Sequence, residues 1–291
     1  MAPLQEGQYM IQTSSQSSAR LNLQHYWVTE SLGYLLHPSI PVAPDAKIAD
    51  IATGTGAWPV SYSLHPDTPS SVQIDGFDVT NDMFPPKDWL PPNVSLRTLD
   101  ILKPVPEELK GVYDVVCIRY FGVQIRNNDP SWVLGNLVEM LKPGSYIQWI
   151  ESDIYSQTVV NFASTATSAE TSGTLASPTA LEQHLDIWRR YLDASGLRYD
   201  WLASLPTHCI DQGMSEAHIY SPPSIPALRF TLTTAVLGAW EELSYNLDKD
   251  EQPDEFLGSG TELREKIRRL WREVEKGAAL EQKFFVTVAR K

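Results

Sequence analysis

Asp50-Ile51-Ala52-Thr53-Gly54-Thr55-Gly56-Ala57 is the stretch that decides the fold of this chain. It closes an apolar run that begins at Lys47 and leads directly into a helical pattern, which predicts a strand, a glycine turn and a helix. Glycine has no Cβ and accepts positive φ, so such a turn lets the backbone contact a bound nucleotide. The stretch therefore predicts a cofactor site with an acidic side chain, Asp50, beside it.

Two common nucleotide motifs do not fit this spacing. A dinucleotide fingerprint needs a third glycine three residues after the second, and Pro59 occupies that position. A P-loop needs Lys followed by Ser or Thr, and no such pair follows Gly56. What remains is an adenosine-containing cofactor without a pyrophosphate, whose positively charged amino-acid end a carboxylate would attract. S-adenosylmethionine meets these requirements.

Polar residues also end the next predicted strands. Residues 72–79 read as a strand ending at Asp78, which lies 22 positions after Gly56, and a ribose-binding acid is expected about 20 residues on. Residues 94–99 and 113–118 read as further strands, and they are followed by the pairs Asp100-Ile101 and Arg119-Tyr120. Because open α/β sheets bind ligands at the carboxyl ends of their strands, we expect these residues to share one site.

Four segments together carry a family resemblance: Ala49–Gly56, Gly76–Val79, Asp114–Arg119 and Leu141–Glu151. With the N-terminal segment Arg20–His25, they resemble class I S-adenosylmethionine-dependent methyltransferases, most closely the fungal branch of secondary metabolism. The resemblance implies an α/β fold: a Rossmann-like, seven-stranded sheet with an N-terminal helical cap and an inserted lid. Two residues depart from the family pattern, since Ala52 and Ser145 stand where glycine is usual.

The resemblance also implies roles for individual residues. Asp50 would hold the methionine amino group, the Gly54 and Gly56 backbone would pass under the cofactor, and Asp78 would bind the ribose hydroxyls. Asp100 and the backbone of Ile101 would bind the adenine, while Arg119 and Tyr120 would line the floor where cofactor and acceptor meet. The full expected cofactor set is Asp50, Ala52, Gly54, Gly56, Asp78, Val79, Asp100, Ile101 and Arg119, with no metal.

Methyl transfer needs little from the protein beyond alignment and exclusion of water, although a base helps a hydroxyl or carbon acid acceptor. His25 is the first candidate base among the histidines of the cap and lid, and Tyr120 is the second expected catalytic residue. Simpler roles stay open at this point. His25 could only pack, Asp100 could cap the next helix, and Arg119 could form a structural ion pair with Glu151 or another carboxylate.

Composition narrows the class of protein. The chain has 291 residues, 42% of them hydrophobic, and a formal charge of −13, with no Lys/Arg-rich face evident. A phosphate backbone would be repelled, so nucleic acid is not expected as a partner. Two cysteines, no secretory signal pattern and no apolar run near 18 residues indicate a reduced, cytoplasmic protein outside the membrane. Oligomeric state stays open.

The order of segments predicts four parts: an N-terminal helical cap (1–45), a cofactor-binding core (46–153), a mobile loop with a lid helix (154–205), and a C-terminal part completing the sheet (206–291). A helical stripe over Val28, Leu32, Leu35 and Leu36 forms the cap, and Ser156–Thr179 is the loop. Aromatic residues near the expected site favour a flat acceptor, aromatic or polycyclic.

Three functions follow from this interpretation. The first is a methyltransferase for a small secondary metabolite, with oxygen favoured as the methylated atom and nitrogen and carbon open. The second is a cyclase of the same fold that keeps S-adenosylmethionine as a fixed cation and transfers no methyl group. The third is a non-catalytic regulator that works through partner proteins. Fold alone does not separate them.

Overall fold

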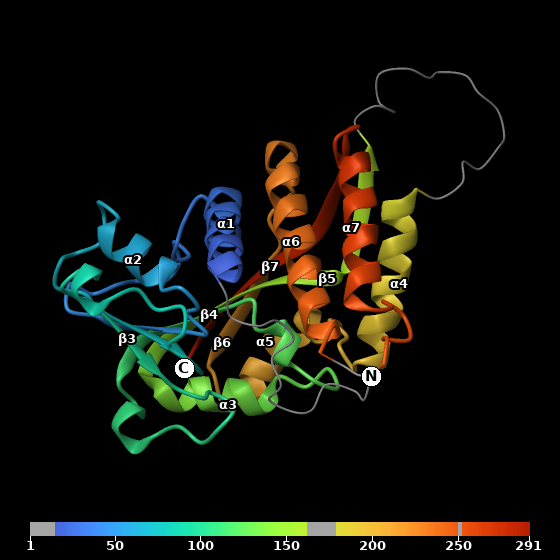
Figure 1. The fold of residues 1–291 in the computed structure, drawn as a ribbon. Helices are drawn as coiled ribbons and strands as arrows, with labels where there is room; N and C mark the ends of the chain where they lie inside the picture. The colour runs from blue at the N-terminus through green and yellow to red at the C-terminus, as the bar shows by residue number, and fades with distance from the viewer. Residues whose placement is uncertain (1–14, 162–178, 250–251) are drawn as a thin grey trace, which may run out of the picture.

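A computed structural model describes residues 15–161, 179–249 and 252–291 (Figure 1). Seven strands form one sheet in the order β3-β2-β1-β4-β5-β7-β6. Strands β3, β2, β1, β4 and β5 are parallel, and β7 runs antiparallel to both β5 and β6. The strands are β1 (Lys47–Ile51), β2 (Gln73–Asp78), β3 (Val94–Thr98), β4 (Tyr113–Arg119), β5 (Leu141–Asn161), β6 (Glu216–Tyr220) and β7 (Ala278–Arg290). This order confirms the predicted seven-stranded methyltransferase sheet.

Helices cover the sheet and extend beyond it. They are α1 (Ser15–Leu32), α2 (Ala57–Leu64), α3 (Ser131–Met140), α4 (Ala180–Ala194), α5 (Trp201–Asp211), α6 (Arg229–Leu247) and α7 (Gly260–Val274). Short 3₁₀ turns lie at Lys87–Trp89, Glu107–Leu109, Gly122–Gln124 and Pro226–Leu228. In Figure 1, α4, α6 and α7 stand together beside the long antiparallel pair of β5 and β7, away from α2 and β3. No helix in the described residues is long and apolar enough to cross a membrane.

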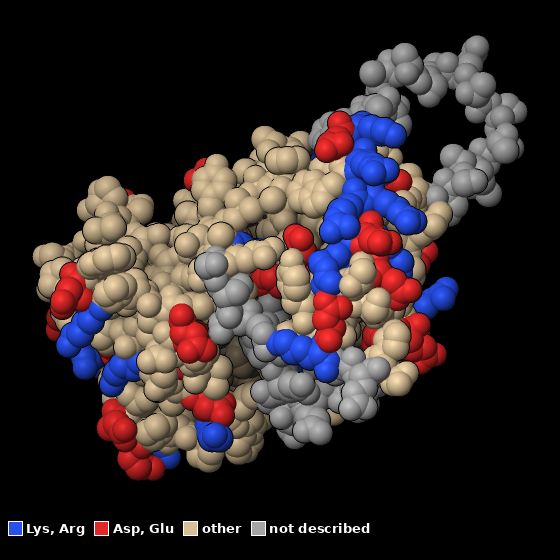
Figure 2. Space-filling model, viewed as in Figure 1, with Lys and Arg blue, Asp and Glu red and all other residues tan. Residues whose placement is uncertain are grey.

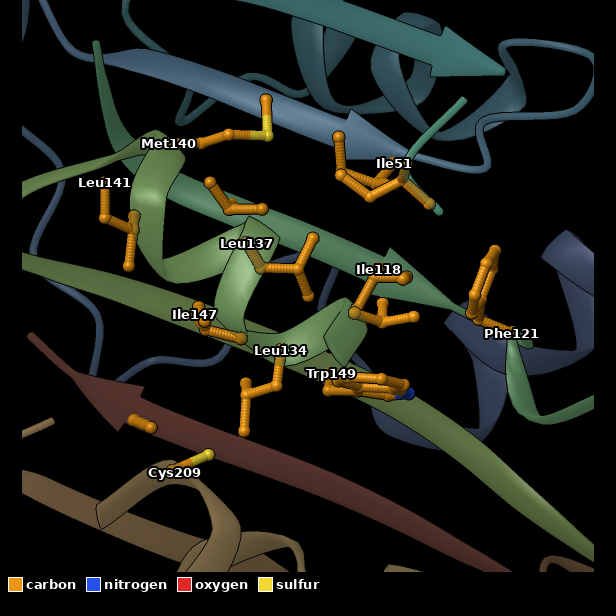
Figure 3. Packing of buried hydrophobic residues seen from close by; sticks show 14 of the residues in the cluster. Ile51, Ile118, Phe121, Leu134, Leu137, Met140, Leu141, Ile147, Trp149 and Cys209 are labelled. Atoms are coloured by element: carbon orange, nitrogen blue, oxygen red, sulfur yellow. The ribbon is translucent and has the colours of Figure 1, made fainter. Parts of the chain in front are cut away.

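Residues alternate between the two faces of the sheet and so build two separate cores. Ile118, Trp149 and Ile147 pack against Leu134 and Leu137 of α3 on one face, as Figure 3 shows. Cys117 and Ile150, their strand neighbours, face the opposite core, which contains residues of α1 and α2. A third cluster joins α4, α6 and α7 under the far end of β5 and β7. The two-residue period of a strand explains this division.

The structure differs from the sequence expectation in four elements. Strand β5 continues to Asn161, where an aperiodic loop was expected from Ser156; residues 162–178 of that loop lie outside the described residues. Helix α1 ends at Leu32 because Gly33 adopts φ 71° and closes the last turn on Thr29, so Leu35 and Leu36 follow the helix. Helices α3 and α5 were not predicted.

Surface charge differs from the expectation in one place. Figure 2 shows mixed signs over most of this face, but Lys and Arg gather over α7. That helix has exposed Arg268, Arg269 and Arg272, with Glu262 and Glu265 also on it. The expectation that no Lys/Arg-rich face exists was therefore wrong for α7, because the acidic total of the chain conceals a local cluster.

Candidate functional site

The glycine turn after β1 is the centre of the candidate site. Gly54 and Gly56 have φ of 60° and 74°, and Ala52 also lies in the left-handed region at 55°. The Gly54 amide donates to Asp78 Oδ2 at 2.8 Å, which ties the turn to the end of β2. The turn thus has the left-handed conformation that glycine accommodates, and at Ala52 the chain adopts it without a glycine.

Asp50 is the most buried acid of the site, with 1% of its surface exposed. The Thr53 hydroxyl donates to its Oδ2 at 2.7 Å, and Arg119 Nε lies 3.8 Å from its Oδ1. Burial raises the pKa of Asp50 to about 6, although Arg119 and the Thr53 hydrogen bond oppose that shift. One guanidinium at this distance only partly compensates the buried carboxyl group.

Arg119 ends β4 and also contacts His25 of α1, with Nη1 3.1 Å from the His25 Nδ1. Guanidinium groups only donate, so Nδ1 must accept, and the ring proton is on Nε2, which lies 2.9 Å from Ser61 Oγ. Burial first and Arg119 second lower the pKa of His25 to about 4. His25 is therefore neutral, and neither ring nitrogen has a free lone pair for a substrate proton in this arrangement.

Asp78 ends β2 with both carboxyl oxygens directed to backbone amides. Its Oδ2 accepts from Gly54 and its Oδ1 from Val79 at 2.9 Å. Burial raises its pKa, and these hydrogen bonds oppose the shift. The neighbouring Val79 side chain is 60% exposed, which leaves apolar surface beside the carboxylate. The backbone amides of Gly54, Val79 and Thr80 take three of the four lone-pair positions of the carboxylate, so one remains for an added ligand.

Asp100 and Ile101 lie at the same edge of the sheet, because the Leu99 amide donates to the Asp78 carbonyl at 2.7 Å. Asp100 Oδ1 accepts from Leu102 N at 3.1 Å, and its Oδ2 pairs with Lys103 at 3.2 Å. The acid thus stabilises a turn, and no helix begins there. The Ile101 carbonyl accepts from Asn136 of α3 at 2.7 Å, a contact that sequence reasoning missed.

Tyr120 follows β4 in a left-handed conformation, with φ 56°, and its amide donates to the Ile150 carbonyl at 3.0 Å. Its side chain is partly buried with the hydroxyl oxygen inside, and desolvation raises the hydroxyl pKa well above its ordinary value. Ala52 and Tyr120 are thus two non-glycine residues with positive φ at the ends of adjacent strands. Such conformations concentrate at functional sites.

Glu151 is the functional candidate that sequence reasoning weighed only as a partner for Arg119. Arg119 instead pairs with Asp50, while Glu151 Oε2 accepts from Gly122 N at 2.7 Å. Glu151 is 3% exposed. Its position at the end of the Leu141–Glu151 segment was the available signal.

The other histidines of the cap and lid have separate surroundings. His184, on α4, is buried against Trp240 of α6. His208 lies near Ser131, and His218 is exposed on β6. Across the three described ranges, no group of three or more His, Cys, Asp or Glu side chains is arranged to hold a metal ion.

The contacts described above join Asp50, His25, Arg119, the glycine turn and Asp78 into one site.

This sheet order with a glycine turn and two acids at its carboxyl edge defines a Rossmann-like fold of the class I methyltransferase type. No family model matches the sequence. The chain is 37% identical over 155 residues to methyltransferase grgD of Penicillium sp, and the alignment covers 51% of this chain and 54% of that protein. It is 33% identical over 147 residues to N-methyltransferase verN of Clonostachys rogersoniana, covering 49% and 50%. The chain spans about half the length of the curated relatives it matches.

Among solved structures, phosphoethanolamine N-methyltransferase 2 of Haemonchus contortus, in complex with S-adenosylmethionine, aligns with a TM-score of 0.47 and 14% identity. The alignment covers 90% of this chain and 52% of that one. By sequence, the chain is similar to the two fungal methyltransferases above, of which verN is named for nitrogen methylation.

Proposed function

We propose that this chain is an S-adenosylmethionine-dependent methyltransferase that acts on a small organic acceptor. The observation that carries the proposal is the joining of Asp50, Arg119, the glycine turn and Asp78 through direct contacts at the carboxyl edge of the sheet. The buried Asp50 and the half-buried Asp78, both with raised pKa values, suit a ligand that brings positive charge. The exposed apolar surface of Val79 suits an adenine ring beside the ribose.

In this proposal the residues of the chain hold and orient the cofactor. Asp50 holds the methionine amino group, the Gly54 and Gly56 backbone passes beneath the ligand, and Asp78 accepts from the ribose hydroxyls. Asp100 and Ile101 serve the adenine, each already fixed by its own turn contacts. When bound, the sulfonium supplies an electrophilic methyl group. Positioning and exclusion of water account for most of the remaining acceleration.

The geometry around His25 bears on which atom is methylated. An oxygen acceptor benefits from a base, yet both nitrogens of His25 are engaged by Arg119 and Ser61. An amine attacks through its own lone pair and loses its proton to water afterwards. We therefore propose that nitrogen, rather than the expected oxygen, is the methylated atom and that His25 orients Arg119. The name of the verN relative is consistent with this choice.

Calorimetric titration with S-adenosylmethionine tests the cofactor site, with Asp78→Asn as the variant. Losing a charged hydrogen-bond acceptor costs about 1.5–3 kcal/mol, so affinity should fall roughly 10- to 100-fold. Asp75→Asn is the matched control, because Asp75 lies on the same strand but bonds Tyr113 and Arg97 instead. Equal affinity in both variants, or no binding to the unaltered chain, would refute the proposal.

Labelled methyl groups then separate the three functions. Transfer of label to amine acceptors supports a nitrogen methyltransferase. Transfer only to hydroxyl compounds would show that oxygen, rather than nitrogen, is the methylated atom. A rearranged acceptor with S-adenosylmethionine unconsumed identifies the cyclase. Absence of cofactor binding together with a stable complex with another protein identifies the regulator.

A further inference from the structure

Two side chains of α3 hold the turn that follows β3, residues 100–103. Trp132 and Asn136 are four positions apart on α3 and therefore lie on one face of the helix. Trp132 Nε1 donates to the Leu102 carbonyl at 2.7 Å. Asn136 Nδ2 donates to the carbonyls of Ile101 at 2.7 Å and Lys103 at 3.0 Å. Three consecutive carbonyls of the turn are thus engaged by α3.

The amides of the 100–103 turn are used within it, with one exception. Leu102 N donates to Asp100 Oδ1 at 3.1 Å, and Lys103 N donates to the Asp100 carbonyl at 3.0 Å. The next residue, Pro104, has no amide hydrogen. In the part of the chain that the structure describes, the Ile101 amide donates to no group, although Ile101 is only 5% exposed. Buried amides are almost always paired, so this one calls for an acceptor from a ligand or an ordered water.

The 100–103 turn therefore presents one free donor, the Ile101 amide, next to one charged acceptor, the Asp100 carboxylate. Adenine has the complementary pair on its Watson–Crick edge, because N1 accepts and the 6-amino group donates. In hypoxanthine, its 6-oxo analogue, N1 carries a hydrogen and the oxygen accepts, so both groups are reversed. Hypoxanthine would need a carbonyl of the turn for N1, and all four carbonyls of residues 100–103 are already engaged.

We propose that Trp132 and Asn136 are positioning residues that set the base selectivity of the cofactor site. By holding the carbonyls of the 100–103 turn, they leave the Ile101 amide as the donor offered to the ligand and reject a base with a hydrogen on N1. The inference rests on the proposed function. It extends the adenine site, which the family resemblance limits to Asp100 and Ile101, to helix α3.

Calorimetric titration with S-adenosylhomocysteine and S-inosylhomocysteine, which differ only in the base, tests the inference. The unaltered chain should prefer the adenosyl compound roughly 10- to 100-fold, as expected where a paired donor and acceptor are mismatched. Asn136→Ala removes two hydrogen bonds from the turn, so the preference should fall by about 5-fold or more. A purely structural role of Asn136 would weaken both ligands equally, and an unchanged preference would overturn the inference.

Asn93→Ala is the matched control. Asn93 Nδ2 also donates to a backbone carbonyl, that of Val72 at 2.9 Å, but at the other end of β3. This variant should keep the preference of the unaltered chain, and a fall as large as that of Asn136→Ala would contradict the role of the 100–103 turn.

Trp132→Phe decides the question if Asn136→Ala does not fold. The Trp132 side chain is 60% exposed, and phenylalanine keeps an aromatic ring there while removing the donor to Leu102. The preference should fall by about 2- to 10-fold, as expected for one hydrogen bond, and an unchanged preference would overturn the role of Trp132.

Failure of this inference is distinct from failure of the proposed function. If the unaltered chain binds the adenosyl and inosyl compounds equally well, the cofactor site stands and the selectivity assigned to the 100–103 turn is refuted. If the unaltered chain binds neither S-adenosylmethionine nor S-adenosylhomocysteine, the proposed function itself is refuted.

Discussion

Replacing Ala52 by glycine should leave the protein as stable as before or make it slightly more stable. Ala52 has φ 55°, and a non-glycine residue in the left-handed region costs about 1–2 kcal/mol. Glycine removes that cost but gains about 0.4–1 kcal/mol of conformational freedom in the unfolded chain. Loss of the half-buried methyl group lowers the free energy of unfolding by about a further 0.4 kcal/mol. The net expectation is a stabilisation of roughly 0.4 kcal/mol.

A matched substitution isolates the backbone contribution. Ala49→Gly lies three residues earlier on β1, fully buried and without positive φ, so it should lose the whole methyl contribution and destabilise by about 1.2–1.8 kcal/mol. The unfolded-state entropy is the same in both variants and cancels in the comparison. Ala52→Gly should therefore exceed Ala49→Gly in stability by about 1.4–2.4 kcal/mol.

Urea unfolding of the two variants and the unaltered chain, with the midpoints and slopes compared, measures this difference. Thermal unfolding should show a separation of several degrees in the same direction. If Ala52→Gly loses as much stability as Ala49→Gly, the left-handed conformation of Ala52 does not carry the assigned cost and the reasoning is refuted.

Two further substitutions test buried groups outside the cofactor contacts. Burial, with Lys266, lowers the pKa of His184 to about 4. As the pH drops below about 6.5, the unfolded chain binds a proton that the folded chain does not, so the stability of the fold decreases. His184→Leu should reduce the loss between pH 7 and pH 5 by about 2 kcal/mol in urea unfolding, and an unchanged loss would contradict this. Gly122→Ala places a Cβ 2.6 Å from the Tyr199 ring and should destabilise the fold by about 1–3 kcal/mol. Its control, Gly135→Ala in α3, should be neutral or stabilising. Equal shifts of the melting temperature in the two variants would contradict the predicted clash at Gly122.

Local sequence signals were sufficient for the parallel half of the sheet. The glycine turn after β1 and the acids after β2 and β3 are each recognised from the few residues around them. Because each follows a predicted parallel strand, all three are expected at the same edge of the sheet. Helix α5 escaped prediction because Pro206 lies inside it, and a proline normally ends a helical pattern. Its helical state depends on tertiary packing, which periodicity does not report.

Site contacts between distant segments were harder to predict than the strands. His25 was proposed as a base from its residue type and its place in the N-terminal segment Arg20–His25, but its contacts are to Arg119, 94 positions away, and to Ser61. The pairing of Arg119 with Asp50 rather than Glu151 depends on which face of the sheet each side chain occupies. Alternation along β4 and β5 contains that information, but only once the register between the strands is known.

Helix α1 connects the cofactor turn to the helices beyond the sheet, and this connection gives the N-terminal segment a physical role. Asn22 accepts from the Thr55 hydroxyl at 2.7 Å, and His25 holds Arg119. On the same helix, Arg20 donates to the buried Glu242 of α6 at 2.8 Å. A shift of α1 would break these contacts together, so a ligand that binds the turn and Arg119 also stabilises the packing of α1 on α6. Cofactor binding should therefore protect the backbone amides of α1 from hydrogen exchange, and unchanged protection would separate the helix from the site.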